Sequence, residues 1–202
     1  MKKKGEIVFT KYGPYTVVDV PIYNEKGVIL ETPRVYSLCR CGESKNKPFC
    51  DGTHGEIGFI GERNLKTPGK TKAYIGENIT IYDNRSICSH NGACVLDNVF
   101  SPDERPWINP DGNPNIEKII EIIKLCPSGA LTYMKDDEHI TAWFDEQKII
   151  VSTDGPLHIQ GEIEIKDDLS SDEILISKEH YTLCRCGKSN NKPFCDGEHL
   201  KK

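Results

Sequence analysis

The stretch LCRCGESKNKPFCDGTH, residues 38–54, decides the organisation of this chain, because it returns almost unchanged at residues 183–199 as LCRCGKSNNKPFCDGEH. The two copies, named here the first and second cysteine loops, differ only at Glu43/Lys188, Lys45/Asn190 and Thr53/Glu198. Each has the spacing C-x-C-x8-C-x3-H, so a short loop brings together three thiolates and one imidazole. Such ligands hold zinc or iron–sulfur clusters. The rest of the chain is interpreted as a scaffold for these two sites, with a third site between them.

The nine cysteines divide into three groups of three. The groups are Cys39, Cys41 and Cys50; Cys88, Cys94 and Cys126; and Cys184, Cys186 and Cys195. Disulfide scaffolds are typical of secreted chains, but here the basic start at Lys2–Lys4 is followed by Gly5 and Glu6 instead of an apolar signal region. An odd count would also leave one thiol unpaired. We therefore favour metal or cluster binding for all nine.

Composition excludes several classes of protein. A net charge of −5 argues against nucleic-acid binding, which usually needs a basic face. No run approaches the roughly 18 apolar residues of a membrane span. With 202 residues and 37% hydrophobic content, the chain has room for one large domain or two to three small ones with modest cores. We expect a soluble cytoplasmic protein.

The duplication extends beyond the cysteine loops. Residues rich in β-branched and aromatic side chains predict strands at 6–10, 15–20 and 34–38. The pattern returns, at an offset of 142 and then 145, at 148–152, 157–165, 173–177 and 181–183. The turn signals Gly13-Pro14 and Gly155-Pro156 occupy equivalent positions. The repeat of a whole unit predicts a pseudo-two-fold pair within one chain.

The middle of the chain has a different composition. It predicts two short strands, KAYIG and ITIYD, and two closing strands at 131–134 and 140–144. Between them Asn113 and Pro114 are suited to start a helix, which should end near Cys126 because Pro127 follows. Its buried face is predicted to carry Ile116, Ile119, Ile120 and Ile123. Linkers are expected at 66–70 and 145–148.

Both cysteine loops resemble the CDGSH iron–sulfur, or NEET, family, whose motif is C-x-C-x2-(S/T)-x3-P-x-C-D-G-(S/A/T)-H. The first loop matches it with Ser44, Pro48, Cys50, Asp51, Gly52, Thr53 and His54, and the second with Ser189, Pro193, Cys195, Asp196, Gly197 and His199. The resemblance implies one 2Fe-2S cluster held by Cys39, Cys41, Cys50 and His54, and another held by Cys184, Cys186, Cys195 and His199. It also implies a strand-swapped β-cap, here formed within one chain. Structural zinc is the alternative, although C-x-C is tighter than the C-x2-C of most zinc sites.

Three details of these loops carry further expectations. Arg40 and Arg185 lie between the paired cysteines, where a cation can face thiolate and sulfide charge. Glu198 departs from the small residue of the motif, and its carboxylate should raise the basicity of His199 or open the loop. A strand at 56–60 follows the first loop and has no counterpart after the second.

A histidine ligand removes negative charge from a cluster and raises its reduction potential, as in the Rieske centres. The imidazole must be neutral to bind, so acid competes with the metal for it. These properties suit a redox relay, a sensor or a cluster donor. We interpret His139, His158 and His180, which lack such a motif, as ordinary surface or strand residues.

The middle cysteines resemble a divergent single-cluster ferredoxin domain that accompanies CDGSH units. The resemblance is carried by CSHNGACV, RPWINPDG and CPSGALTY, and it covers residues 72–135. The usual second ligand position is Asn91, a poor ligand. Either Cys88, Cys94 and Cys126 alone hold a 3Fe-4S cluster, or His90 adds a fourth ligand for a 4Fe-4S cluster; His90 could equally be a donor to cluster sulfide. Trp107 is expected to cover the cluster.

The sequence thus predicts an α+β protein in which two β-rich CDGSH units of NEET β-cap type form an intramolecular pseudo-dimer around an inserted ferredoxin-like α+β domain. The expected domains are residues 1–66, 67–146 and 147–202. The predicted function is one-electron transfer by two 2Fe-2S clusters and one 4Fe-4S or 3Fe-4S cluster, without enzymatic activity. The alternative is cluster transfer, storage or redox sensing. Partners would be redox proteins or apo iron–sulfur acceptors, and the chain would be a monomer or a weak homo-oligomer.

Overall fold

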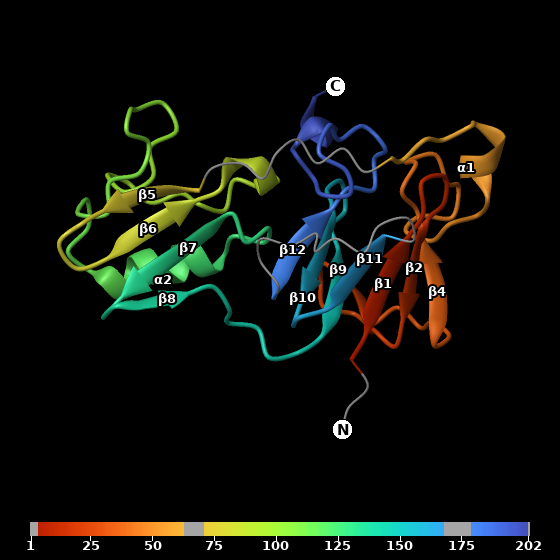
Figure 1. Ribbon diagram of the computed structural model, residues 1–202, viewed down its shortest axis with the longest axis horizontal. Coiled ribbons are helices and arrows are strands. Elements are labelled where there is room, and N and C mark those ends of the chain that lie inside the picture. The colour runs from red at the N-terminus through yellow and green to blue at the C-terminus, as the bar shows by residue number, and fades with distance from the viewer. Residues whose placement is uncertain (1–3, 63–70, 168–178, 202) are drawn as a thin grey trace.

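The computed structural model describes residues 4–62, 71–167 and 179–201, which form mostly β-structure with short helices, an α+β arrangement (Figure 1). Its named strands form three four-stranded sheets. The first sheet contains β1 (Glu6–Phe9), β2 (Tyr15–Val18), β4 (Val35–Leu38) and β11 (Glu164–Asp167). The second contains β3 (Ile22–Asn24), β9 (Lys148–Val151), β10 (Leu157–Gln160) and β12 (His180–Leu183).

The two halves of the chain exchange strands. In the first sheet the order is β11-β1-β2-β4, so the late strand β11 pairs in parallel with β1. In the second sheet the order is β12-β10-β9-β3, so the early strand β3 pairs in parallel with β9. Each sheet is otherwise an antiparallel meander from its own half. Backbone hydrogen bonds therefore bind the two halves together.

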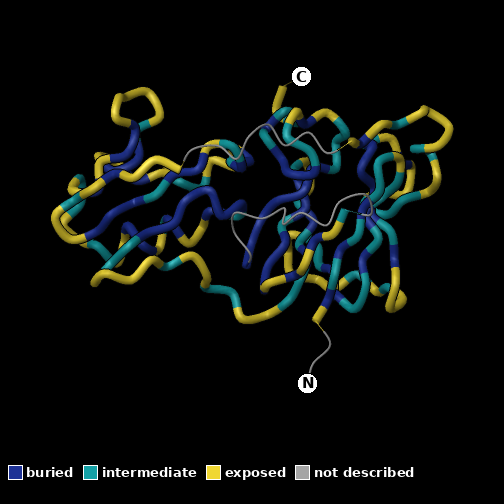
Figure 2. Tube along the Cα trace, in the orientation of Figure 1, coloured by how far each residue is buried: buried dark blue, intermediate teal, exposed yellow. Residues whose placement is uncertain are grey.

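The strands alternate inward and outward side chains, as half-buried strands do. In the first hairpin Ile7, Phe9, Tyr15 and Val17 are at most 1% exposed, and in the second Ile149, Leu157 and Ile159 are as deeply buried. Buried positions run along the strands in both sheets, while most turns are exposed (Figure 2). The equivalent hairpins confirm the strands predicted at 6–10, 15–20 and 148–152.

The middle of the chain forms the third sheet, named here the central sheet. It contains β5 (Lys72–Ile75), β6 (Thr80–Asp83), β7 (Leu131–Lys135) and β8 (Glu138–Ile140), in that order and all antiparallel. Helix α2 (Ile116–Lys124) packs against β7. Its buried residues are Ile119, Ile120 and Ile123, with Ile116 partly buried against the same core. This confirms the predicted apolar face.

The remaining named elements are short helices beside the cysteines. α1 (Thr53–Glu56) carries the end of the first cysteine loop, and the 3-10 helix η2 (Glu198–Leu200) occupies the equivalent place in the second. The 3-10 helix η1 (Arg85–Ile87) leads from β6 to Cys88. Within the described residues, no helix is long and apolar enough to cross a membrane.

Four local predictions were wrong. Residues 157–165 are two strands, because Gly161 and Glu162 both have positive φ and break the extended backbone. The partner of β7 ends at Ile140 instead of running through 140–144, because Asp136 and Asp137, both at positive φ, close a tight hairpin. Helix α2 is capped by Asn115, whose side chain accepts from the Lys118 N–H. Asn113 instead accepts from the Asn115 N–H.

The fourth error concerns residues 56–60, where no strand forms. Gly52, at φ 92°, turns the chain into α1, and the Phe59 N–H then bonds back to the His54 carbonyl. The predicted strand at 173–177 and the predicted linker at 66–70 lie outside the described residues.

The half-buried His158 should make the fold sensitive to acid. Burial lowers the pKa of His158 from 6.5 to about 4, so between these pH values the histidine is protonated in the unfolded chain and neutral in the folded chain. The neutral histidine costs nothing above pH 6.5, and the penalty grows as the pH falls from there towards 4. We expect His158→Gln to reduce the loss of stability between pH 7.5 and 5 by about 1–2 kcal/mol.

Differential scanning calorimetry at pH 7.5 and pH 5 measures the acid-induced drop in Tm, which reports this loss of stability. His139→Gln, at an exposed position of β8, is the matched control. An equal acid-induced drop in Tm for wild type and both variants would contradict the prediction.

Candidate metal centres

The first cysteine loop places its donors in two close pairs. Cys39 and Cys41 leave β4 with their Sγ atoms 3.7 Å apart, and the Cys50 Sγ lies 3.2 Å from Nδ1 of His54 on α1. Two thiolates bound to one tetrahedral metal at about 2.3 Å lie about 3.8 Å apart. Each pair therefore has the spacing of two ligands on one metal atom.

The second cysteine loop repeats this geometry. The Cys184 and Cys186 Sγ atoms are 3.6 Å apart, and the Cys195 Sγ lies 3.4 Å from Nδ1 of His199. Within the described residues, no three His, Cys, Asp or Glu side chains are grouped closely enough to hold a single metal ion. The donors are thus arranged as pairs in both loops.

The other motif residues brace the loops. In the first, the Ser44 hydroxyl donates to the Phe49 carbonyl and accepts from the Asn46 N–H, while Asp51 accepts from the N–H groups of Lys45 and Thr53. In the second, Ser189 and Asp196 make the same bonds at Phe194, Asn191, Asn190 and Glu198. The hydrogen bonds to Asp51 lower its pKa to about 2. The small motif residues therefore fix the loop that carries the donors.

Backbone donors also point at the thiol sulfurs. The Gly42 N–H lies 3.3 Å from Cys39 Sγ, and the Glu43 N–H lies 3.5 Å from Cys41 Sγ. Such bonds stabilise negative charge on sulfur and are one way in which a protein tunes an iron–sulfur cluster. The donor set, the pairing and these N–H groups fit the 2Fe-2S cluster that the sequence implies.

The two motif arginines were expected to face the thiolates, but their donors go to backbone carbonyls. Arg40 is 3% exposed, bonds to the carbonyls of Thr10, Gly13 and Gly61, and stacks on Phe9, Tyr15 and Phe59. Arg185 bonds to the carbonyls of Ser152, Thr153 and Gly155. A long guanidinium fork suits this work because it satisfies several acceptors at once. Each arginine ties its cysteine loop to the hairpin turn of its own half.

Glu198 is also engaged differently from the expectation. Its carboxylate pairs with Lys201 at 2.5 Å, and its N–H bonds to Asp196 as the Thr53 N–H bonds to Asp51. The neighbouring ammonium offsets the carboxylate charge beside His199. The second loop keeps the closed hydrogen-bond pattern of the first.

The two cysteine loops touch. A Cβ at Gly42 would lie 2.6 Å from the Cys186 carbonyl oxygen, and one at Gly187 would lie 2.4 Å from that of Cys41. Both glycines also have positive φ, so the close contact and the backbone conformation each favour glycine at these two positions.

Tyr15 makes a second contact between the halves. It is fully buried and donates its hydroxyl to the carbonyls of Cys184 and Pro193. Sequence reasoning missed this role, because a tyrosine in a strand is an ordinary core residue.

The third group of cysteines lines one cavity beside the central sheet. Cys88, Cys94 and Cys126 surround about 170 Å³ together with His90 and Trp107. Asn91 lines it as well. Burial raises the pKa of the Cys88 and Cys94 thiols. Buried thiols that must ionise to act as ligands gain most from positive metal charge. Three converging cysteines fit a single cluster.

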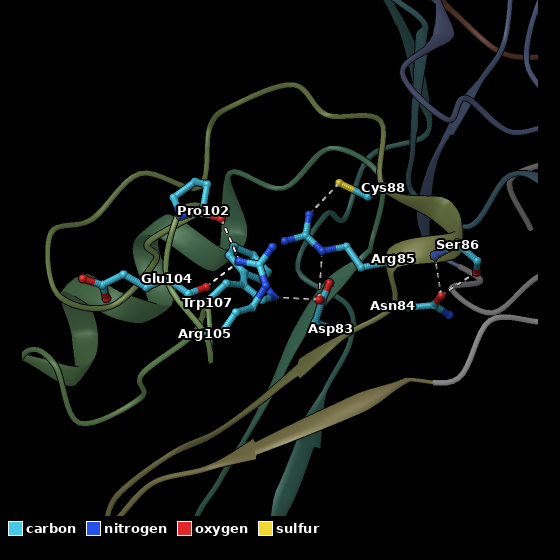
Figure 3. A network of polar contacts seen from close by, with 9 residues as sticks. All are labelled: Asp83, Asn84, Arg85, Ser86, Cys88, Pro102, Glu104, Arg105 and Trp107. Atoms are coloured by element: carbon cyan, nitrogen blue, oxygen red, sulfur yellow. Dashed lines mark hydrogen bonds and ion pairs between the residues drawn. The ribbon is translucent and has the colours of Figure 1, made fainter.

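Arg85 supplies a cation beside this cavity (Figure 3). Its guanidinium lies 3.6 Å from Cys88 Sγ, pairs with Asp83 at 3.0 Å and covers the Trp107 ring at 3.7 Å. Trp107 in turn donates its indole N–H to Asp83. Trp107 therefore borders the cavity as expected, while the role of Arg85 was missed because it lies outside the cysteine spacing.

His90 lies at the border between the middle cavity and the second cysteine loop. It lines the cavity of Cys88, Cys94 and Cys126, and its ring packs on Gly197, where a Cβ would lie 2.8 Å from Cδ2. His90 has a φ of 53°, a left-handed backbone conformation that bends the chain two residues after Cys88. The thiolate charge of Cys88 also contributes to the pKa of Cys195, which burial raises to about 12. The middle and second sites are neighbours.

The other three histidines occupy strands, as expected. They are His139 in β8, His158 in β10 and His180 in β12. His180 is fully buried and lies 2.6 Å from the Glu179 carboxylate, away from the cysteine loops along its strand. It is a core residue and not a surface one.

Three groups of clustered sulfur donors define an iron–sulfur protein, and comparisons with known proteins agree. The family described as "Iron-binding zinc finger CDGSH type" matches residues 12–55 and 154–200, and the family described as "Divergent 4Fe-4S mono-cluster" matches residues 74–136. The uncharacterized protein YjdI of Escherichia coli, in strains K12 and O157:H7, is 42% identical over 67 residues, covering 32% of this chain and 87% of the relative. No solved structure matches the chain.

The chain belongs to the CDGSH iron–sulfur family, with two CDGSH units flanking a divergent 4Fe-4S mono-cluster domain.

Removing the Tyr15 hydroxyl should weaken the second site. Tyr15→Phe removes the hydroxyl donor to the Cys184 carbonyl and one of two donors to the Pro193 carbonyl, which also accepts from the Cys184 N–H; this should cost about 1–3 kcal/mol. We expect a lower urea midpoint by circular dichroism and faster loss of visible absorbance from the second site in sub-denaturing urea.

Tyr36→Phe is the control, because the Tyr36 hydroxyl donates to Val20 within the first half. Tyr36→Phe should lower the urea midpoint without faster loss of visible absorbance from the second site. Identical behaviour of the two variants would show that Tyr15 does not support the second loop.

Proposed function

We propose that this protein transfers single electrons between redox proteins, using one 2Fe-2S cluster in each CDGSH unit and one cluster in the middle domain. The observation that carries the proposal is the pairing of donors, Cys39 with Cys41 and Cys50 with His54, repeated in the second loop. Two pairs supply two ligands to each of two iron atoms, whereas structural zinc needs four ligands around one atom.

The same proposal covers the architecture. The exchange of β3 and β11 supports an intramolecular pseudo-dimer of two CDGSH units, in which each unit lends one strand to the other. The central sheet with α2 supports a ferredoxin-like α+β insertion between them. One chain would then reproduce the pair that single CDGSH units form by dimerisation.

The middle cluster is proposed to be 4Fe-4S in its assembled form, with 3Fe-4S as the alternative. The match to a 4Fe-4S mono-cluster family favours four irons. Cys88, Cys94 and Cys126 would supply three ligands, and His90, which lines the same cavity, could supply the fourth. If His90 is not a ligand, the three cysteines alone suit the three-iron form.

When bound, the clusters accept and release one electron at a time. The chain's own residues hold and tune them. The N–H groups of Gly42 and Glu43 point at thiol sulfurs, and Arg40 and Arg185 hold the loops closed. A neutral histidine ligand carries less negative charge than a cysteine thiolate, which makes the cluster easier to reduce. We infer a cytoplasmic electron carrier without enzymatic activity, acting on redox protein partners.

The alternative is a cluster donor or redox sensor. The histidine side of the first site favours it, because Cys50 and His54 are only half-buried and are flanked by the exposed Gly52 and Gly55. An apo iron–sulfur protein could reach a cluster from that side. In this case the clusters are cargo, and ligand exchange replaces electron exchange.

Metal analysis tests the cofactor assignment. Protein purified without oxygen should be red-brown, with about seven or eight iron and sulfide per chain, because each outer site takes two irons and the middle site three or four. Colourless protein with about three zinc ions per chain would overturn it.

Changing the histidines tests the ligand sets. His54→Cys and His199→Cys should each keep a cluster and lower its reduction potential, because thiolate donates more charge than imidazole. Spectroelectrochemical titration measures the potentials, and His139→Cys, outside the sites, is the control. Unchanged potentials in both ligand variants would show that these histidines are not ligands.

Two assays on the same preparation separate carrier from donor. Reduced protein mixed with an oxidised ferredoxin acceptor should pass on electrons, while its own iron and sulfide stay bound. Incubation with apo-ferredoxin should leave the acceptor colourless. Transfer of iron and sulfide to the apo-acceptor, without electron transfer to the holo-acceptor, would favour the donor function.

A further inference from the structure

The stretch NKPFCDG occurs at residues 46–52 and again at 191–197, yet the two copies have different surroundings. Asn46 and Gly52 are exposed, whereas Asn191 is half-buried and Gly197 is buried. Cys50 is half-buried and Cys195 is 2% exposed. Identical sequences cannot produce this difference, so the second copy must be covered by another part of the chain.

The cover comes from the segment that carries Cys88. The Asn191 side chain donates to the Ser86 carbonyl at 2.5 Å, and the His90 ring lies on Gly197. Figure 1 shows the second cysteine loop between the central sheet and the first sheet, while α1 of the first loop lies on the far side. Within the part of the chain that the structure describes, the mono-cluster domain thus docks on the second CDGSH loop.

The backbone on the middle-domain side of this contact is held by local hydrogen bonds. Ser86 belongs to η1, whose N-cap Asn84 accepts from both the N–H and the hydroxyl of Ser86. His90 follows two residues after Cys88, and Gly197 lies between Cys195 and His199. The contact therefore joins the donor-bearing turns of two sites directly. Electron transfer slows steeply as the gap between two centres widens, and packed atoms carry it better than open solvent.

We propose that the contact of Ser86 and His90 with the loop 191–197 is the electron junction between the middle and second sites, and that the first site receives electrons only through the second. The proposal rests on the proposed carrier function. With clusters held by Cys88, Cys94 and Cys126 and by Cys184, Cys186, Cys195 and His199, this contact would carry one electron from the middle site to the second, without bond cleavage or proton transfer. A low-potential ferredoxin-type protein supplies the electron to the middle cluster.

The continuation to the first site has its own contact. Gly42 and Gly187 bring the two cysteine loops together at the Cys41 and Cys186 carbonyls. The middle domain and the first loop have no contact of comparable kind among the described hydrogen bonds. The order middle, second, first follows, and it makes the exposed edge of the first site the exit towards a partner.

Two glycines give a matched test. Gly197→Ala pushes a Cβ into the His90 ring, whereas Gly52→Ala meets nothing within 4 Å. Both positions have positive φ, 85° and 92°, so the backbone strain of alanine is the same in each. The difference between the two variants therefore reports the His90 contact alone.

The readout is magnetic and independent of any partner. In dithionite-reduced protein, a nearby reduced middle cluster speeds the spin relaxation of a 2Fe-2S cluster, so its EPR signal saturates at higher microwave power. His54→Cys and His199→Cys assign the two 2Fe-2S signals to their sites. In wild type we expect the half-saturation power of the second signal to exceed that of the first several-fold. Gly197→Ala should lower the half-saturation power of the second signal towards that of the first. Gly52→Ala should leave both half-saturation powers unchanged.

Asn191→Ala and Asn46→Ala repeat the comparison if Gly197→Ala loses its cluster. Asn191→Ala removes the bond to Ser86, and its counterpart Asn46 is exposed. Equal half-saturation powers in wild type, or equal effects of the paired variants, would overturn the junction while leaving the carrier function intact. Strong coupling in a protein that passes no electron to a ferredoxin acceptor would overturn the carrier function alone. Protein without a middle cluster would overturn both.

Discussion

The parallel pairing of β3 with β9 and of β11 with β1 is the constraint on which the rest of this structure depends. A three-stranded meander of short strands buries little apolar surface by itself. Each half gains a fourth strand from the other, and Ile22 and Ile165 are buried in the borrowed positions. Neither sheet can be complete without the partner half. The positions of both cysteine loops are therefore fixed relative to each other by backbone hydrogen bonds.

That fixed placement explains why the loops can touch without side chains between them. Gly42 and Gly187 remove the Cβ atoms that would separate the backbones, and Tyr15 reaches across to the Cys184 carbonyl. The position equivalent to Tyr15 is Leu157, which has no hydroxyl to offer in return. The pair of halves is thus symmetric in its sheets and asymmetric in the support of its sites.

The sequence predicted the parts of the structure that depend on local chemistry. The cysteine spacing predicted the donor loops, and alternating apolar residues predicted the hairpins around Gly13 and Gly155. The family resemblance implied an exchange of strands, but the residues themselves did not show which strands are exchanged, because β3 is three residues long and its partner β9 lies over 120 residues away. The carbonyl partners of the two arginines could not be predicted for the same reason. The carbonyls that Arg40 holds belong to a turn and a tail that only the fold brings beside it.

Duplication gives a chain something that a symmetric dimer of identical subunits cannot have, which is two equivalent loops with different neighbours. Among the described residues, the middle domain contacts the second loop through Ser86 and His90 and makes no comparable hydrogen bond to the first loop. Asn191 binds Ser86, while Asn46, in the same sequence context, remains exposed. The motif residues are needed in both copies to hold the metal-ligand side chains, so the two sites can differ only in the residues that surround them. The third cysteine of the motif is half-buried at Cys50 and buried at Cys195, so the two sites differ in solvent access at this ligand, and solvent access tunes reduction potential. In the proposed relay, one motif would therefore supply two steps without any change in its ligands.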